Sequence, residues 1–311
     1  MDAPQLLIRC LALTALLQFG SEFAVAQPLP PPGDPFLAQG DPFLPSSPVQ
    51  VPPTPTFVHP SNWVWQVRPN GTLYHTYWAN PHEPRLATHT LGDEDGTFQD
   101  SSIGGRVGIV KFGPKGIDQG FQLDVLGGAK LRQDWTNEMS VYAADFRYDI
   151  LGTWADGPNR WKFGFYHVSA HVGDEFLAFN PGFQRIDYFR DTLVLGYSHN
   201  PFPELRLYGE VGWAFHTNVS EPWEIQLGFD YGPAGPTGPW GAPFAAANVH
   251  LREELNFGGT LGMQLGWAWR GEQMGDGVLR TGLFVNEGAT PHLSFYRQSE
   301  TQVGWGLWYD Y

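Results

Sequence analysis

The sequence predicts a single antiparallel transmembrane β-barrel of about twelve strands. Segments of alternating apolar and polar residues recur from about residue 72 onward. Aromatic residues make up 15% of the chain, which favours a barrel with aromatic girdles at both membrane interfaces. The mean hydropathy is only -0.28 although 42% of the residues are hydrophobic, because the polar face of a barrel strand offsets its apolar face.

The alternation has the period of a β-strand. In residues 205–216, apolar side chains such as Leu207 and Trp213 alternate with polar ones such as Arg206 and Glu210. Successive side chains of a strand point to opposite faces. The pattern recurs at residues 142–150, 223–231 and 257–269. The strands of a soluble β-sandwich also alternate. Here, however, the apolar faces are long and end in Trp and Tyr, and the opposite faces carry Gly, Gln and charged residues. Both features favour a barrel with a polar lumen.

Twelve strands are expected, and their connections alternate in length. The strands are expected to begin near residues 73, 104, 119, 139, 160, 191, 204, 222, 244, 257, 278 and 302. An even number places both termini in the periplasm. Short turns are expected there at residues 113–116, 156–159 and 200–203, and longer extracellular segments at 80–102, 174–190 and 287–301. The long turn at 232–243 leaves the count open by one hairpin.

The N-terminal region has a different character. Residues 1–26 are predicted to be a signal peptide, with an apolar stretch followed by Ala24-Val25-Ala26 as the cleavage pattern. Residues 27–60 are predicted to be a proline-rich, disordered linker, and the barrel to occupy residues 61–311. The single cysteine, Cys10, lies in the predicted signal peptide, so disulfides and thiolate chemistry are excluded from the mature chain.

The last strand resembles the C-terminal signal of outer-membrane barrels. Gly306, Tyr309 and Tyr311 match that signal, whereas Gly304 departs from it mildly. The resemblance implies the barrel-assembly machinery as a partner, acting on the strand that ends at Tyr311, and a bacterial outer-membrane location. Outer-membrane lipid is the other expected partner. The net charge of -14 argues against nucleic acid, which needs a basic surface, and no cofactor is expected.

One cluster of side chains could carry chemistry. His167, Ser169 and His171 share one face of a predicted strand at its extracellular end. A histidine and a serine on one face are able to approach as a general base and a nucleophile. This His-x-Ser arrangement resembles outer-membrane phospholipase A and the lipid A 3-O-deacylase, which are barrels. The resemblance implies His167 as the base and Ser169 as the nucleophile of a lipid hydrolase.

The third catalytic residue of those enzymes lies on the next strand, where this chain departs from the pattern. At the family spacing after Ser169 stands Pro181, with Asn180 just before it. Asp191 is the expected partner of the histidine and Asp187 the alternative. Both flank the start of the following strand.

Other polar residues allow different interpretations. His171, Asp174 and Glu175 are candidate binding residues, but His167 and His171 lie roughly 13 Å apart along a strand and are not expected to chelate one metal. No metal site is therefore predicted. The cluster could equally be a polar network of the lumen or rim. His216 and His250 fall on the predicted polar face and are expected to point into the lumen.

Three stretches resemble the family called domain of unknown function 1207: residues 79–85, 167–175 and 205–210. The resemblance implies an outer-membrane barrel of planctomycete-type bacteria and no particular activity. Three functions remain open on the sequence. A pore or structural envelope protein is the favoured interpretation. A serine-dependent lipid hydrolase, and a surface receptor or adhesin that uses its long loops, are the alternatives.

Overall fold

The computed structural model describes residues 58–271 and 277–311, so the predicted signal peptide and almost all of the predicted linker lie outside the described residues. The N-terminal elements are the short 3-10 helix η2 (Pro60–Asn62) and the strand β1 (Val64–Val67). The first six barrel strands are β2 (Leu86–Gly92), β3 (Thr97–Gly113), β4 (Gly120–Asp134), β5 (Ser140–Asp156), β6 (Asn159–Val172) and β7 (Tyr188–Phe202). The other six are β8 (Leu205–Thr217), β9 (Trp223–Tyr231), β10 (Ala242–Arg252), β11 (Gly258–Arg270), β12 (Val278–Ala289) and β13 (Ser299–Asp310).

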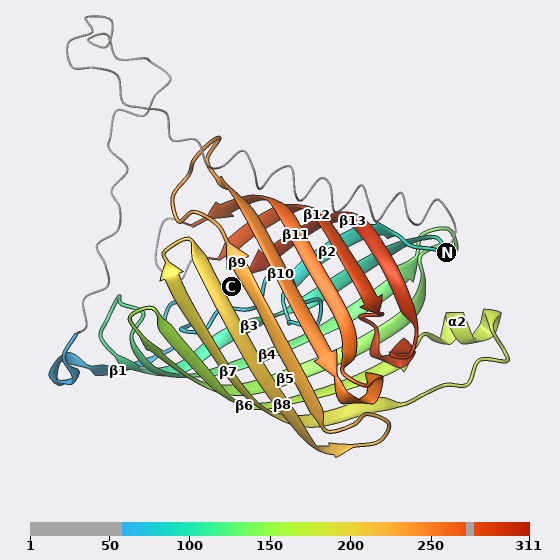
Figure 1. The fold of residues 1–311 in the computed structure, drawn as a ribbon, viewed down its shortest axis with the longest axis horizontal. Helices are drawn as coiled ribbons and strands as arrows, with labels where there is room; N and C mark the ends of the chain where they lie inside the picture. Colours follow the sequence, from blue (N-terminus) through green and yellow to red (C-terminus); the bar gives the residue numbers. More distant parts are fainter. Residues whose placement is uncertain (1–57, 272–276) are drawn as a thin grey trace, which may run out of the picture. The chain divides into compact units, whose positions relative to one another are not determined.

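The strands β2 to β13 close into a barrel (Figure 1). Each strand pairs antiparallel with the next along the chain, and β13 returns to pair with β2, with Tyr309 opposite Leu86. β1 lies outside this ring of twelve and pairs with the end of β3, with Val64 opposite Gly113. The predicted fold class, an antiparallel barrel of about twelve strands, is confirmed.

The outer face of the barrel is apolar. On β6, for example, Trp161 and Phe163 are exposed, whereas Lys162 between them is buried in the interior. Leu195 on β7 and Val211 on β8 continue the exposed apolar surface. Monomeric soluble proteins rarely expose contiguous apolar area of this extent, so this belt is the surface that faces lipid in a transmembrane barrel. Among the described residues, no helix is both long enough and apolar enough to span a membrane.

The expected first strand, near residue 73, is wrong. Residues 72–85, here called the plug, run through the barrel interior, and β2 begins only at Leu86. Its aromatic residues Tyr74, Tyr77 and Trp78 are buried against the inner faces of barrel strands. The expected long connection at 80–102 is wrong for the same reason. It contains the end of the plug, all of β2, a short turn and the start of β3.

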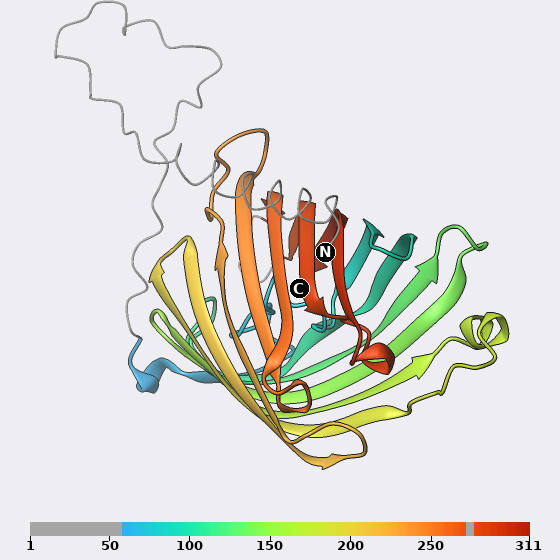
Figure 2. The same ribbon diagram turned by 45° about the vertical axis from the view of Figure 1, so that its right-hand side comes forward.

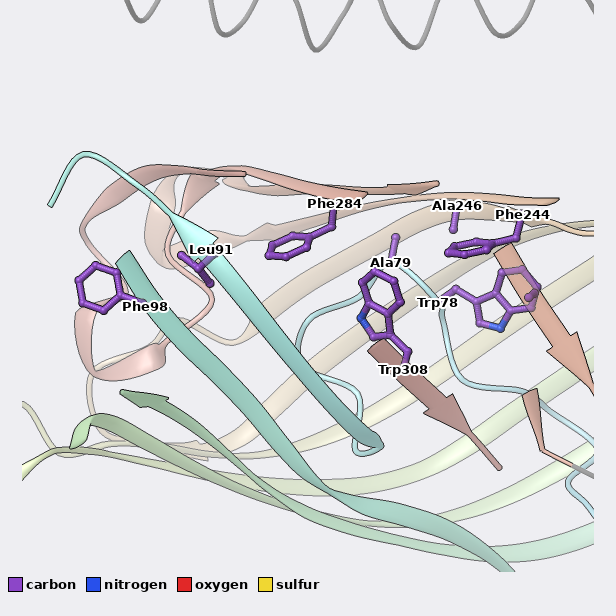
Figure 3. Packing of buried hydrophobic residues seen from close by; sticks show 9 residues of the cluster. Trp78, Ala79, Leu91, Phe98, Phe244, Ala246, Phe284 and Trp308 are labelled. Carbon is purple, nitrogen blue, oxygen red and sulfur yellow. The ribbon is translucent and has the colours of Figure 1, made fainter. Parts of the chain in front are cut away.

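The plug is held by both apolar and polar contacts. Trp78 and Ala79 pack beside Phe244 and Trp308 of the barrel wall (Figure 3). The Tyr77 ring stacks on another aromatic ring of the wall, with ring centroids 3.9 Å apart. Its hydroxyl donates a 2.8 Å hydrogen bond to a carboxylate on β8. The lumen of this barrel is therefore occupied by its own chain.

One end of the barrel carries the more elaborate connections. Between β6 and β7 lies the helix α2 (Asp174–Phe179), which projects beyond the ends of these strands (Figure 2). Between β12 and β13 lies the 3-10 helix η4 (Leu293–Phe295), whose residues are all buried. The backbone N–H of Leu293 donates to Asp145 of β5, so this connection folds over the barrel end. The 3-10 helix η3 (Glu253–Leu255) joins β10 to β11.

Candidate functional site

The predicted cluster lies on the outer face of β6. His167, Ser169 and His171 are partly exposed there, while Val168 and Ala170 between them are buried. The same outward face carries the apolar belt nearer the middle of the strand. The cluster is therefore a surface feature of the barrel wall at the strand end next to α2, and not a network of the lumen.

The register between β6 and β7 places His167 directly opposite Asp191. The Nδ1 atom of His167 lies 2.6 Å from Oδ1 of Asp191. An ionised carboxylate only accepts hydrogen bonds, so Nδ1 carries the hydrogen and donates it. The Nε2 atom is then the nitrogen left to accept a proton, which is the tautomer that a general base needs.

The alternative partner does not reach the histidine. Asp187 lies in the connection before β7 and forms an exposed ion pair with Arg185, at 3.0 Å. Arg185 also lies 3.4 Å from Nδ1 of His171. Of the two carboxylates considered from the sequence, Asp191 is the one that the fold brings to His167.

Ser169 lies two residues beyond His167 on the same outward face, opposite Phe189 of β7. Side chains two residues apart on one strand are about 7 Å apart at their Cα atoms. A histidine ring and a serine hydroxyl can bridge that separation. Within residues 58–271 and 277–311, no hydrogen bond joins the two side chains, as is common for catalytic pairs without substrate.

His216 was expected to point into the lumen, and this is wrong. The pairing of β7 with β8 shifts between Asp191, which is opposite His216, and Thr192, which is opposite Ala214. The extra residue, Phe215, forms a β-bulge, which interrupts the alternation of faces. Phe215 and His216 consequently both point outward.

The bulge brings His216 to the site. Its Nδ1 atom lies 2.8 Å from Oδ2 of Asp191, so that carboxylate binds one imidazole with each oxygen. Its ring also contacts the Phe189 ring, with centroids 5.0 Å apart. The sequence alone does not place His216 at this site. Regular alternation of side chains along a strand would turn it into the lumen, and only the bulge turns it outward. His250, by contrast, is buried in the lumen, 3.0 Å from Glu224.

Aromatic rings border the cluster on its apolar side. Tyr148 of β5 stacks on His167, with ring centroids 5.2 Å apart and planes inclined by 27°. Phe165 packs against both Tyr148 and Phe215, at centroid distances of 5.9 and 6.0 Å. The opposite border is polar, with His171 and the Arg185 side chain. The site thus lies where the apolar belt meets a polar rim.

The remaining candidate binding residues have other positions. Glu175 accepts a hydrogen bond from the backbone N–H of Val141 and so ties α2 to β5. Asp174 is exposed at the start of α2. In the part of the chain that the structure describes, no group of three or more potential ligands could hold a metal ion.

The lumen contains a second group of ionisable residues, next to a small cavity above the plug. Arg190, Glu224 and Arg252 line this cavity together with plug residues such as Glu83. The charges are mutually paired: Arg190 lies 3.5 Å from Glu224, and Lys162 lies 3.8 Å from Glu83. Buried networks of this kind rigidify an interior. Residues 79–85 form the end of the plug, and Glu83 and Arg85 among them take part in buried ion pairs with the wall.

Comparison with known proteins identifies a family. The model of a family described as protein of unknown function (DUF1207) matches residues 68–311. No curated protein matches the chain. The solved outer membrane phospholipase A from Escherichia coli is 10% identical, with a TM-score of 0.48, over 74% of this chain and 94% of that chain.

Two further solved structures are similar to the chain at the same low identity. The Salmonella typhi outer membrane phospholipase dimer with bound calcium is 10% identical, with a TM-score of 0.48, over 73% of this chain and 91% of that chain. An anion-selective porin from Comamonas acidovorans is 10% identical, with a TM-score of 0.32, over 72% of this chain and 96% of that chain. None of these likenesses bears on the chemistry of the site.

Proposed function

Since the chain belongs to DUF1207, a family described as protein of unknown function, we propose its activity from its own geometry: it hydrolyses acyl esters of membrane lipids on the outer wall of its barrel. The observation that carries the proposal is the 2.6 Å contact between His167 Nδ1 and Asp191 Oδ1, with Ser169 beside them on the same face. These side chains supply a nucleophile, a base and a group that orients the base.

The proposed chemistry is acyl transfer in two steps. His167 Nε2 removes the hydroxyl proton of Ser169 while Oγ attacks the ester carbonyl carbon. The tetrahedral intermediate collapses as His167 donates this proton to the departing alcohol, which leaves an acyl-serine. Water then attacks the acyl-serine with His167 again as the base, and the proton returns to Ser169. The products are a fatty acid, an alcohol and the free enzyme, and Asp191 stabilises the imidazolium formed in each step.

The borders of the site favour an amphiphilic substrate. Tyr148, Phe165 and Phe215 form an apolar surface on the side of the membrane belt, where an acyl chain would lie. His171 and Arg185 border the other side, where a polar headgroup would lie. An ester bond at the junction of chain and headgroup would then be level with Ser169. Outer-membrane lipid is therefore the proposed substrate class.

The proposed location is the bacterial outer membrane, with both termini in the periplasm. The twelve-stranded closure supports it, because an even number of strands leaves both ends on one side. The end that carries α2 and η4 would then be extracellular, in keeping with the longer outer loops of such barrels. His167 and Ser169 would be level with the outer leaflet.

An open pore is the less favoured alternative. The plug lies in the lumen, and its Tyr77 and Arg85 are bound to charged groups of the wall. The cavity beside the plug has a volume of about 40 Å³, which is enough for a few water molecules. Free diffusion of solutes through this interior would require displacement of the plug.

Ester release by the purified protein in detergent micelles tests the proposal. Wild-type protein is expected to release fatty acid from a phospholipid or a long-chain nitrophenyl ester, and Ser169→Ala to lose this activity. Ser299→Ala, at an exposed position at the start of β13, is the matched control and should remain fully active. The shift in gel mobility on heating shows that each variant is folded. Ester release by folded Ser169→Ala at the wild-type rate would reject the hydrolase.

A further inference from the structure

The position of His216 carries an inference that rests on the proposed hydrolase and extends it. Asp191 accepts from two imidazoles at once, with Oδ1 2.6 Å from Nδ1 of His167 and Oδ2 2.8 Å from Nδ1 of His216. The proposed mechanism requires only the first contact. The second therefore needs a separate explanation.

We propose that His216 is a positioning residue that fixes the Asp191 carboxylate, and through it the catalytic imidazole of His167. The terminal torsion of an aspartate is broad, so a carboxylate held by one partner can rotate about this bond. Hydrogen bonds at both oxygens, from β6 on one side and β8 on the other, remove that freedom. The base is then held in the productive tautomer and ring orientation before substrate binds.

The bulge is the structural device that makes this contact. If these residues paired regularly, without the bulge at Phe215, the alternation of faces would turn His216 inward. Bulges are enriched beside active sites because they redirect a side chain. Here the redirected side chain is the one that reaches Asp191. The contact of the His216 ring with the Phe189 ring, at 5.0 Å between centroids, restrains the imidazole further.

The contact of His216 with Asp191 contributes little to the stability of the fold, so variants of His216 should fold and can be assayed. The His216 side chain is 63% exposed, and exposed ion pairs stabilise proteins little. Replacement of His216 should leave the barrel intact. Two imidazoles, those of His216 and His167, face Asp191. Arg190, which neighbours Asp191 on β7, is buried in the lumen, where it lies 3.5 Å from Glu224.

Kinetics of three variants form the first part of the experiment. His216→Phe is expected to lower kcat about tenfold or more, since small misplacements of a catalytic group are costly, with KM unchanged. His216→Asn is expected to retain most of kcat, because its side-chain amide nitrogen stands where Nδ1 of the imidazole does and donates to Oδ2. His199→Phe is the matched control. Like His216, His199 points outward and is hydrogen-bonded through Nδ1, in its case to Asn159 at 2.9 Å. It lies on β7, at the end of that strand far from Asp191.

Ser169→Ala, measured in parallel, separates the two claims. If Ser169→Ala is inactive while His216→Phe equals the wild type, the hydrolase stands and the positioning role is rejected. A raised KM with unchanged kcat in His216→Phe also rejects it, because His216 would then bind substrate directly. If Ser169→Ala stays active, the hydrolase itself is rejected.

A second measurement does not depend on turnover. Nuclear magnetic resonance of protein with ¹⁵N-labelled histidine in detergent detects the Nδ1–H proton of His167 that is shared with Asp191. This signal is expected to broaden or vanish in His216→Phe and to persist in His216→Asn and His199→Phe. An unchanged signal in His216→Phe would overturn the positioning role even if no substrate were turned over.

Discussion

Arg85 lies 3.1 Å from Asp310, which joins the end of the plug to the last barrel strand. Both side chains are buried, and the Arg85 guanidinium also donates to the backbone oxygens of Tyr77 and Trp78 at 2.6 and 2.8 Å. The Arg85 side chain therefore links two parts of the plug to each other and links the plug to the barrel wall. Asp310 is bound in addition by Arg280, at 2.7 Å.

Removal of this tie is expected to loosen the plug. Arg85→Leu leaves the backbone oxygens of Tyr77 and Trp78 without this donor and removes one partner of the buried Asp310 carboxylate. Breaking a buried ion pair lowers the free energy of unfolding by about 3–5 kcal/mol. A lowered unfolding temperature in detergent and the appearance of ion conductance in planar bilayers should follow. Arg297→Leu, on an exposed arginine near η4, is the control and should change neither. A closed barrel of unchanged stability in Arg85→Leu would contradict this role of the plug.

The two carboxylates considered from the sequence are expected to behave differently. Asp191→Ala should lower kcat by roughly 10⁴-fold, as loss of the orienting carboxylate does in serine hydrolases. Asp187→Ala should leave kcat unchanged, because Asp187 forms only an exposed ion pair with Arg185. Initial rates of ester release on folded protein measure both. Equal losses in the two variants would contradict the assignment of Asp191.

The stability of the barrel end that carries α2 and η4 is expected to fall in mild acid. Burial lowers the pKa of His292 below its usual value, although the neighbouring Asp100 carboxylate opposes the effect. The unfolded chain then takes up a proton near pH 6.5 that the folded protein does not. The stability from the neutral ring is complete above that pH and is lost progressively as the pH falls from about 6.5 toward the folded pKa.

Unfolding temperatures between pH 8 and pH 5 measure this effect. His292→Gln should reduce the decline on the acid side, because the glutamine does not titrate. His59→Gln, at an exposed position before η2, should leave the decline as in the wild type. A decline of the same size in His292→Gln would show that other groups cause it.

The alternation of residues made the barrel predictable, because strand parity alone assigns side chains to faces. The same parity put Asp191 on the face of His167, and the structure brings them together. Parity could not identify the plug, since Tyr74, Tyr77 and Trp78 have the composition of a membrane strand.

The limit of parity is clearest at the bulge. The bulge at Phe215 turns His216 to the outer face of the barrel, and no pattern in the sequence indicates this bulge. The plug depends on contacts across the barrel, such as that of Arg85 with Asp310, which lie far apart in the chain. Local pattern predicts strands and their faces, whereas bulges and long-range ion pairs require the structure.

Covalent labelling of Ser169 tests the central claim most directly. A long-chain fluorophosphonate reacts with a serine that an adjacent base activates, and mass spectrometry of the digested protein locates the adduct. The proposed site predicts one adduct, on Ser169, at a rate that falls sharply in His167→Ala and Asp191→Ala but not in Asp187→Ala. Folded wild-type protein that leaves Ser169 unlabelled, or labels it equally fast without His167, would contradict a catalytic site on the barrel wall.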